Sequence, residues 1–266
     1  MPSQARPAAA LLAAAATATV AVTGMRVWHA RTPGRSDTQA LRLAARLPGA
    51  SGPAGHGLAT AVVDAVTPAA VVGATVALAV LAWVLLRHRP VTVRLRVVGF
   101  CLAAPLAARG AEAAIKQLVD RRPPHWGQLP AAMVAHNPML ALSYPSGHVA
   151  ITTTLALAGL LVLGAARVPA ALVAAAMAAA AATIGAVSVS LVVLGFHFAS
   201  DVLGGATLGI AVALTGALAT SLRPPRSRCH PDGPDRGGRD PTSAATTRPA
   251  PAGPGPGPAR TPRGRA

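Results

Sequence analysis

The stretch Ser143-Tyr144-Pro145-Ser146-Gly147-His148 separates a polar loop from a long apolar run that ends near residue 164. Pro145 fixes its backbone φ and Gly147 frees its own, so the chain can turn sharply and point successive N–H groups at one place. Because the apolar run begins here, we expect these groups at a helix N-terminus, where the helix dipole favours a bound anion. Taken alone, four residues such as Pro-Ser-Gly-His are also typical of an ordinary turn and helix cap. The neighbouring residues decide between the two interpretations.

Apolar runs recur along the chain at lengths that suit membrane-spanning helices. Hydrophobic residues make up 52% of the 266 residues, and charged residues only 12%. A helix needs about 20 mostly apolar residues to cross the hydrocarbon core of a bilayer. The sequence therefore predicts an all-α fold, a six-span transmembrane helical bundle, with spans near residues 8–24, 68–86, 97–115, 148–164, 170–194 and 199–222.

Composition divides the chain into three parts. Residues 1–66 hold the first apolar run and a polar loop with an amphipathic stretch at 38–47, residues 67–222 hold the other five spans, and residues 223–266 form a basic tail rich in Pro and Gly. The first run is either a signal anchor or a cleaved signal peptide, and its weakly charged start favours an anchor. Nothing in the tail can bury a core, so we predict that it is disordered.

The basic balance and the cysteines exclude several classes of protein. The formal charge is +16, yet the arginines lie in loops and in the tail, without interleaved aromatics or a groove-reading motif. We therefore exclude a nucleic-acid partner. Cys101 in an apolar run and Cys229 in the tail make neither a disulfide framework nor a zinc-ligand spacing. Membrane lipids remain as partners, and the pattern indicates no particular oligomeric state.

The distribution of arginine predicts how the spans are oriented. An even number of spans puts both termini on one side, and the basic hinge at residues 87–96 is expected in the cytoplasm by the positive-inside rule. We therefore predict a multi-pass plasma-membrane protein with cytoplasmic termini. The loop 117–147 and the turn 195–201 then lie on the extracytoplasmic side. The arginines of residues 25–67 fall on that side too, against the rule.

Three charged residues interrupt the third predicted span. Arg109, Glu112 and Lys116 are spaced i, i+3 and i+7, so they share one helix face and can pair or line a polar interior. Lys116 is the only lysine in a chain that otherwise uses arginine. These charges lie near the same predicted membrane surface as Ser146 and His148.

A second polar pair lies at the start of the last span. His197 and Asp201 are spaced i, i+4, so the carboxylate can accept the imidazole N–H and leave the other ring nitrogen open. The same pair would also suffice to hold a helix end. A zinc site built from His148, His197 and Asp201 is disfavoured because no further ligand is evident. The predicted topology brings these residues to the membrane surface that holds Lys116.

Taken together, the ordered motifs resemble those of the type 2 phosphatidic acid phosphatase family, the membrane relatives of the vanadium haloperoxidases. That family shows a Lys followed after six residues by Arg-Pro, then Pro-Ser-Gly-His, then Ser-Arg with five residues before a His that is followed by three residues and an Asp. The chain holds the second motif complete at residues 145–148, and the third as Ser190, His197 and Asp201. The resemblance covers residues 67–221.

Two positions depart from the family pattern. Only five residues separate Lys116 from Arg122-Pro123, so either the loop is one residue tighter or Arg121 and Arg122 share the role. Leu191 stands where the family has arginine, which removes a phosphate-clamping cation. The loss of one such donor typically lowers the rate about 10²–10³-fold. Two main functions therefore stay open, an active enzyme and a weakened or inactive homologue that binds or transports lipid phosphates. A third, a helical scaffold whose basic tail holds anionic lipids, leaves the ordered motifs unexplained.

The resemblance implies a metal-independent membrane hydrolase without a cofactor, acting on a lipid phosphate or a polyprenyl diphosphate. His197, oriented by Asp201, would attack phosphorus to give a phosphohistidine, and His148 would act first as acid and then as base. The resemblance also implies a set of groups that bind the substrate phosphate and stabilise the transition-state charge: Lys116, Arg121, Arg122, Ser146 and Gly147.

Overall fold

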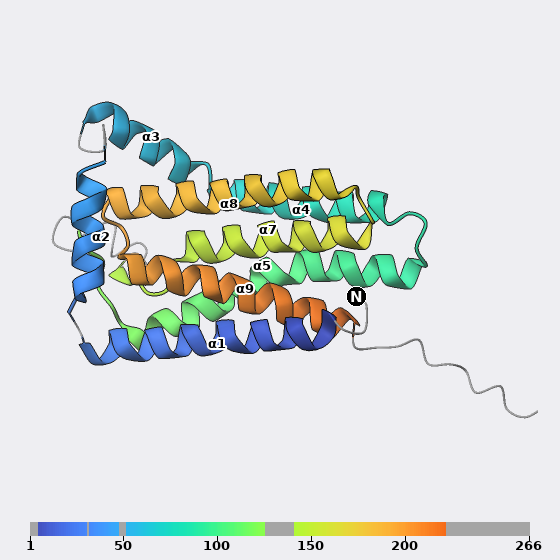
Figure 1. Cartoon of the computed structure of the whole chain (residues 1–266), viewed down its shortest axis with the longest axis horizontal. Coiled ribbons are helices and arrows are strands. Elements are labelled where there is room, and N and C mark those ends of the chain that lie inside the picture. The colour runs from blue at the N-terminus through green and yellow to red at the C-terminus, as the bar shows by residue number, and fades with distance from the viewer. Residues whose placement is uncertain (1–4, 31, 48–51, 126–140, 222–266) are drawn as a thin grey trace, which may run out of the picture. The chain divides into compact units, whose positions relative to one another are not determined.

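Helices make up most of the structure, a computed structural model that describes residues 5–30, 32–47, 52–125 and 141–221. These residues form eight helices (Figure 1): α1 (Ala5–Ala30), α2 (Arg35–Ala45), α3 (Pro53–Asp64), α4 (Pro68–Leu85), α5 (Val91–Val119), α7 (Gly147–Ala165), α8 (Ala170–Val193) and α9 (Ala199–Ser221). Six of them, α1, α4, α5, α7, α8 and α9, are long and apolar enough to cross a membrane. The predicted all-α bundle with six spans is therefore confirmed. The predicted tail and residues 126–140 of the predicted loop lie outside the described residues.

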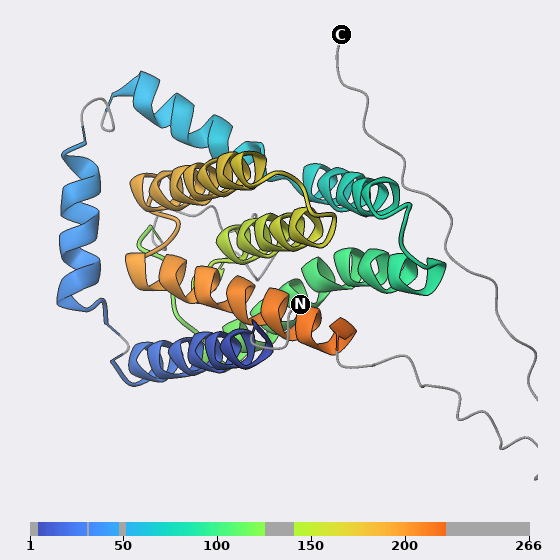
Figure 2. The ribbon, with the colours of Figure 1, turned by 45° about the vertical axis from the view of Figure 1, so that its right-hand side comes forward.

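Two short helices occupy the segment that we predicted as a polar loop. The amphipathic stretch forms α2, which lies across the ends of α8 and α9 in both ribbon views (Figures 1 and 2). The other helix, α3, was not expected. It begins with Pro53 at its first position, where a missing N–H breaks no helical hydrogen bond. Its Val62 and Val63 pack against a buried cluster on α7 and α8, so tertiary contacts stabilise a helix that local sequence pattern does not predict.

The third span is longer than predicted. We expected residues 97–115, whereas α5 covers 29 residues, Val91–Val119, and is therefore about 44 Å long. At its start the guanidinium of Arg94 lies 3.5 Å from the ring centroid of Trp83 on α4, so part of the predicted basic hinge is helical. At its end Glu112 and Lys116 pair with each other, which lets the helix continue through charged residues.

Small side chains let the spanning helices approach closely. A buried cluster joins α4, α5 and α7, and alanine is its commonest residue: Ala79, Ala82, Phe100, Cys101, Ala104, Ala158 and Val162. Within a membrane, helix association depends on such close packing more than on hydrophobicity.

A close contact between α7 and α9 fixes the position of the loop that precedes α7. A Cβ atom added at Gly205 would lie 2.4 Å from the carbonyl oxygen of Ser146, and one at Gly209 would lie 2.6 Å from the carbonyl oxygen of Ala150. The N–H of Ser146 donates to the carbonyl of Asp201 over 2.9 Å. The start of α7 is therefore tied directly to the start of α9.

Gly205→Ala tests this contact. The added methyl group meets backbone rather than a flexible side chain, so α7 and α9 must move apart, and we expect a loss of about 1–3 kcal/mol of stability. The matched control is Gly185→Ala on α8, where nothing lies within 4 Å of the added atom. The control should be neutral or slightly stabilising because alanine is the better helix former. Thermal unfolding in detergent compares the two, and equal midpoints would contradict the close contact.

Candidate active site

The ends of three helices form the candidate site. The C-terminal end of α5 and the N-terminal ends of α7 and α9 meet at the end of the bundle that α2 crosses (Figure 1). These ends carry Lys116, Ser146, His148, His197 and Asp201. The structure thus brings residues that are up to 85 positions apart in the sequence to one end of the described bundle.

Tyr144 anchors the loop that precedes α7. Its side chain is fully buried, and its hydroxyl donates to the carbonyl of Val20 on α1 over 2.8 Å. A Cβ atom added at Gly204 would lie 2.5 Å from the tyrosine ring, so α9 leaves room for it. Burial, followed by the nearby charge of Asp201, raises the pKa of Tyr144 to about 12. The phenol therefore stays neutral at physiological pH and serves as a donor.

Glu112 and Lys116 on α5 are buried in the bundle, whereas Arg109 is exposed. Glu112 is 1% exposed, and its Oε1 lies 2.9 Å from the Nζ of Lys116, while Arg109 pairs with the other carboxylate oxygen. A Cβ atom at Gly147 would lie 2.5 Å from Glu112 Oε1, so the carboxylate rests directly on the first residue of α7. The helix N-terminus that we predicted as an anion site therefore faces an anion of the chain itself.

Two buried polar atoms beside this carboxylate have no hydrogen-bond partner among the described residues. They are Ser146 Oγ and His197 Nδ1, and the residues that carry them are 0% and 7% exposed. Buried polar groups are normally satisfied, so each exception needs an explanation, such as a catalytic role or a bound ion. His148, which is half-buried on the first turn of α7, lies near His197 and Lys116.

The predicted pair of His197 and Asp201 is close without being hydrogen-bonded. The distance between His197 Nδ1 and Asp201 Oδ2 is 3.7 Å, longer than a hydrogen bond. Asp201 is fully buried, and its Oδ2 accepts the N–H of Phe198 over 2.8 Å. This bond holds the carboxylate next to the imidazole, so only a small side-chain movement separates the observed geometry from the predicted one.

Arg121 contacts carboxylates. Its Nη1 lies 2.6 Å from Asp201 Oδ1, its Nη2 lies 2.6 Å from Asp37 Oδ2, and its guanidinium lies 4.1 Å from the ring centroid of Phe198. The residue is only 8% exposed. Arg122, in contrast, is exposed. The two arginines that we predicted as phosphate ligands therefore have different surroundings.

Sequence reasoning missed Asp37. It lies in the first turn of α2 and is 3% exposed, although it precedes the amphipathic stretch that we singled out. Its partners, Arg121 and Ser200, lie 84 and 163 positions away in the sequence. A surface-type residue in a loop of unknown position gives no signal of such contacts, and the only hint was its place at the start of a predicted helix.

Leu191, which replaces the family arginine, is buried in an apolar cluster. It is 1% exposed and packs with Val149 and Val187. Its carbonyl accepts the N–H groups of Phe196 and His197 over 3.0 and 3.3 Å. Position 191 therefore fixes the backbone of His197 even without a charged side chain. No group of three or more His, Cys, Asp or Glu residues able to hold a metal occurs in the described ranges.

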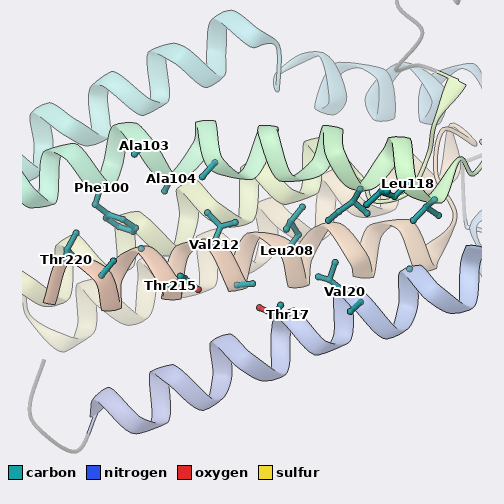
Figure 3. Close-up of a pocket in the computed structure, with 18 of the residues that line it drawn as sticks. Thr17, Val20, Phe100, Ala103, Ala104, Leu118, Leu208, Val212, Thr215 and Thr220 are labelled. Atoms are coloured by element: carbon teal, nitrogen blue, oxygen red, sulfur yellow. The ribbon is translucent and has the colours of Figure 1, made fainter. Parts of the chain in front are cut away.

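An apolar cavity of about 1180 Å³ runs between α1, α5 and α9 (Figure 3). Figure 3 shows side chains such as Val20, Phe100 and Val212 lining it from these three helices. Its lining continues to Leu118, two residues beyond Lys116. Val20 and Gly24 line the cavity and also contact Tyr144, so the loop that precedes α7 borders the cavity through this tyrosine.

Six apolar helices of this length are typical of an integral multi-pass membrane protein. The family model described as PAP2 superfamily matches residues 94–224. Over these residues the chain belongs to the PAP2 superfamily, a phosphatase family. The predicted family is thereby confirmed.

A solved structure shows the same fold. The crystal structure of the first transmembrane PAP2 type phosphatidylglycerolphosphate phosphatase from Bacillus subtilis is 18% identical to this chain, with a TM-score of 0.58. The similarity covers 75% of this chain and 93% of the other. At this identity the likeness supports the shared fold alone. No curated protein matches the chain.

Proposed function

We propose that the protein is a membrane phosphatase that hydrolyses a lipid phosphate or polyprenyl diphosphate through a phosphohistidine. The observation that carries the proposal is the arrangement around the start of α7, where His148, His197 and Lys116 lie at the same end of the bundle as a buried serine hydroxyl that has no described partner. Family membership supports a phosphatase in general. The apolar cavity beside the site supports a substrate with a hydrocarbon chain.

The chemistry follows from the positions of the two imidazoles. Because His197 Nδ1 faces Asp201, its Nε2 is the nitrogen that attacks phosphorus. As the N–P bond forms, the P–O bond to the leaving group breaks, and His148 gives that oxygen a proton. Water then attacks the phosphohistidine, His148 takes the proton of the water, and inorganic phosphate leaves. No metal takes part in this scheme.

The groups that neutralise the phosphate are fewer than the sequence predicts. Lys116 and the start of α7 suit this role, because both lie against the carboxylate of Glu112. Arg122 and the hydroxyl of Ser146 complete the set in this proposal. Arg121 supports Asp201 instead, since its guanidinium is committed to two carboxylates. The substrate phosphate displaces Glu112 when it binds.

We propose the extracytoplasmic side of the plasma membrane for the site. The exposed residues Arg87 and Arg89 and the turn around Arg167 lie at the opposite end of the bundle. Positive charge of this kind is retained in the cytoplasm. The site at the other end then faces outward, and both termini are cytoplasmic.

Phosphate release from purified protein tests the function. In excess chelator, the full-length chain should release inorganic phosphate from one or more of phosphatidic acid, phosphatidylglycerol phosphate and a polyprenyl diphosphate. The rate profile over this panel then identifies the substrate. If no lipid of the panel yields phosphate, the proposal is contradicted. If phosphate is released without chelator but not in its presence, metal independence is contradicted.

Leu191 favours a second candidate, a homologue that binds lipid phosphates without turnover. Leucine at this position packs in an apolar cluster, so the site lacks the arginine that the family pattern has here. This candidate predicts that vesicles containing phosphatidic acid bind the protein while no phosphate appears. The two functions are thus separated by measuring binding and release on the same preparation.

A further inference from the structure

Asp37 on α2 forms polar contacts with residues of the site, and no sequence motif predicts them. Its Oδ1 accepts the N–H of Ser200 over 3.0 Å, and its Oδ2 accepts the hydroxyl of Ser200 over 2.9 Å and Arg121 Nη2 over 2.6 Å. The residue is 3% exposed. It lies outside residues 94–224, which the family model matches. The contact is therefore a feature of this chain beyond the part that defines its family.

The hydroxyl of Ser200 shows how the contact is organised. This oxygen lies 2.9 Å from Asp37 Oδ2 and 2.6 Å from Arg121 Nη1. A carboxylate only accepts and a guanidinium only donates, so the serine proton points to Asp37 and a lone pair faces Arg121. The hydroxyl thus joins the two charges in a fixed direction.

Arg121 links Asp37 to Asp201 through one ion pair with each carboxylate. Its planar guanidinium is held by Asp37 through Nη2 and by Asp201 through Nη1, and it lies on the ring of Phe198. A planar fork with a partner on each side has a single orientation. Asp201 Oδ1 is therefore fixed by Arg121, which leaves Oδ2 to face the Phe198 N–H and the imidazole of His197.

We propose that Asp37 is a positioning residue for the phosphatase reaction: it fixes Arg121, and through Arg121 the carboxylate that orients His197. This inference rests on the proposed function. Without the negative charge of Asp37, Arg121 pairs with Asp201 alone and turns toward it, and the carboxylate follows the guanidinium away from the imidazole. Asp37 touches no substrate, so it acts on the chemical step and leaves lipid binding unchanged.

Asp37→Asn in the full-length chain tests the proposal. The kcat for phosphate release should fall about 10–100-fold, which is the usual cost of losing a residue that orients a functional side chain. The KM for the same lipid should stay within about twofold. The matched control is Asp64→Asn, because Asp64 is an exposed acid at the end of α3. A variant with wild-type kcat, or with a changed KM alone, would overturn the proposal.

A second variant covers the case in which Asp37→Asn does not fold. Ser200→Ala keeps all three charges and removes only the bridging hydroxyl. It should lower kcat as well. Where Asp37→Asn does fold, the losses in the double mutant should not add, because both act through Arg121. Unchanged kcat in Ser200→Ala, or strictly additive losses, would overturn the proposal.

A readout that needs no turnover separates this proposal from the proposed function. The imidazole nitrogen resonances of His197, assigned with His197→Gln, should shift in Asp37→Asn and not in Asp64→Asn. If the wild-type protein releases no phosphate while these resonances shift, the proposed function fails and the positioning contact stands. Unshifted resonances contradict the contact whatever the activity.

Discussion

Replacing His197 with alanine is expected to abolish phosphate release, with a loss of at least about 10⁴-fold in kcat, as for other enzymes whose covalent nucleophile is removed. The imidazole is 7% exposed, its backbone N–H is fixed by the carbonyl of Leu191, and its Nδ1 faces Asp201. No other described histidine has a buried carboxylate at this distance. The remaining groups of the site then bind the lipid phosphate without a bond being formed.

Two measurements separate loss of chemistry from loss of structure. His88→Ala is the matched control, because His88 is exposed between α4 and α5 at the far end of the bundle. It should retain wild-type kcat. Acid-labile phosphate should be trapped on the wild-type protein and be absent from His197→Ala. Undiminished release by His197→Ala in folded protein would end the proposed mechanism.

Arg121→Met is expected to lower the free energy of unfolding by about 3–5 kcal/mol, the usual result of removing one partner of a buried ion pair. The substitution keeps much of the side-chain volume and removes the charge. It leaves Asp37 and Asp201, which are 3% and 0% exposed, without their cation. Thermal and denaturant unfolding in detergent measure the loss.

A second substitution identifies the origin of this loss. Adding Asp37→Asn to Arg121→Met removes one of the two stranded carboxylates, so the double variant should be more stable than the sum of the single effects indicates. Arg42→Met, at an exposed position of α2, is the control and should stay within about 0.5 kcal/mol of wild type. A loss in Arg121→Met no larger than in Arg42→Met would contradict the buried pair.

The spanning helices were predictable because each apolar run meets the length that a bilayer demands. The ends of α5 were not, since charged residues at both ends suggested that the helix stops, whereas Glu112 and Lys116 satisfy each other inside it. The helix α3 was missed for a related reason. Its apolar face has a partner only once α8 is in place, and no local pattern carries that information.

The same limit applies to the candidate site. Ordered motifs and an even number of spans sufficed to bring His148, His197 and Asp201 to one end of the bundle. The partners of Arg121 could not be predicted, because the sequence does not show whether an arginine faces a substrate or a carboxylate on a distant helix. Asp37 and Arg121 are 84 positions apart and obey no spacing rule. Only the docking of α2 brings them together.

The carboxylate of Glu112 on the first residue of α7 makes the site resemble an ion exchanger. Under the proposed function, an arriving phosphate replaces a carboxylate that is tethered to the protein, so binding exchanges one anion for another. A tethered competitor has a fixed effective concentration. Because this carboxylate already pairs with Lys116 and Arg109, we expect small anions from the surrounding solution to compete poorly with it, and a phosphate ester, which carries more charge, to compete better.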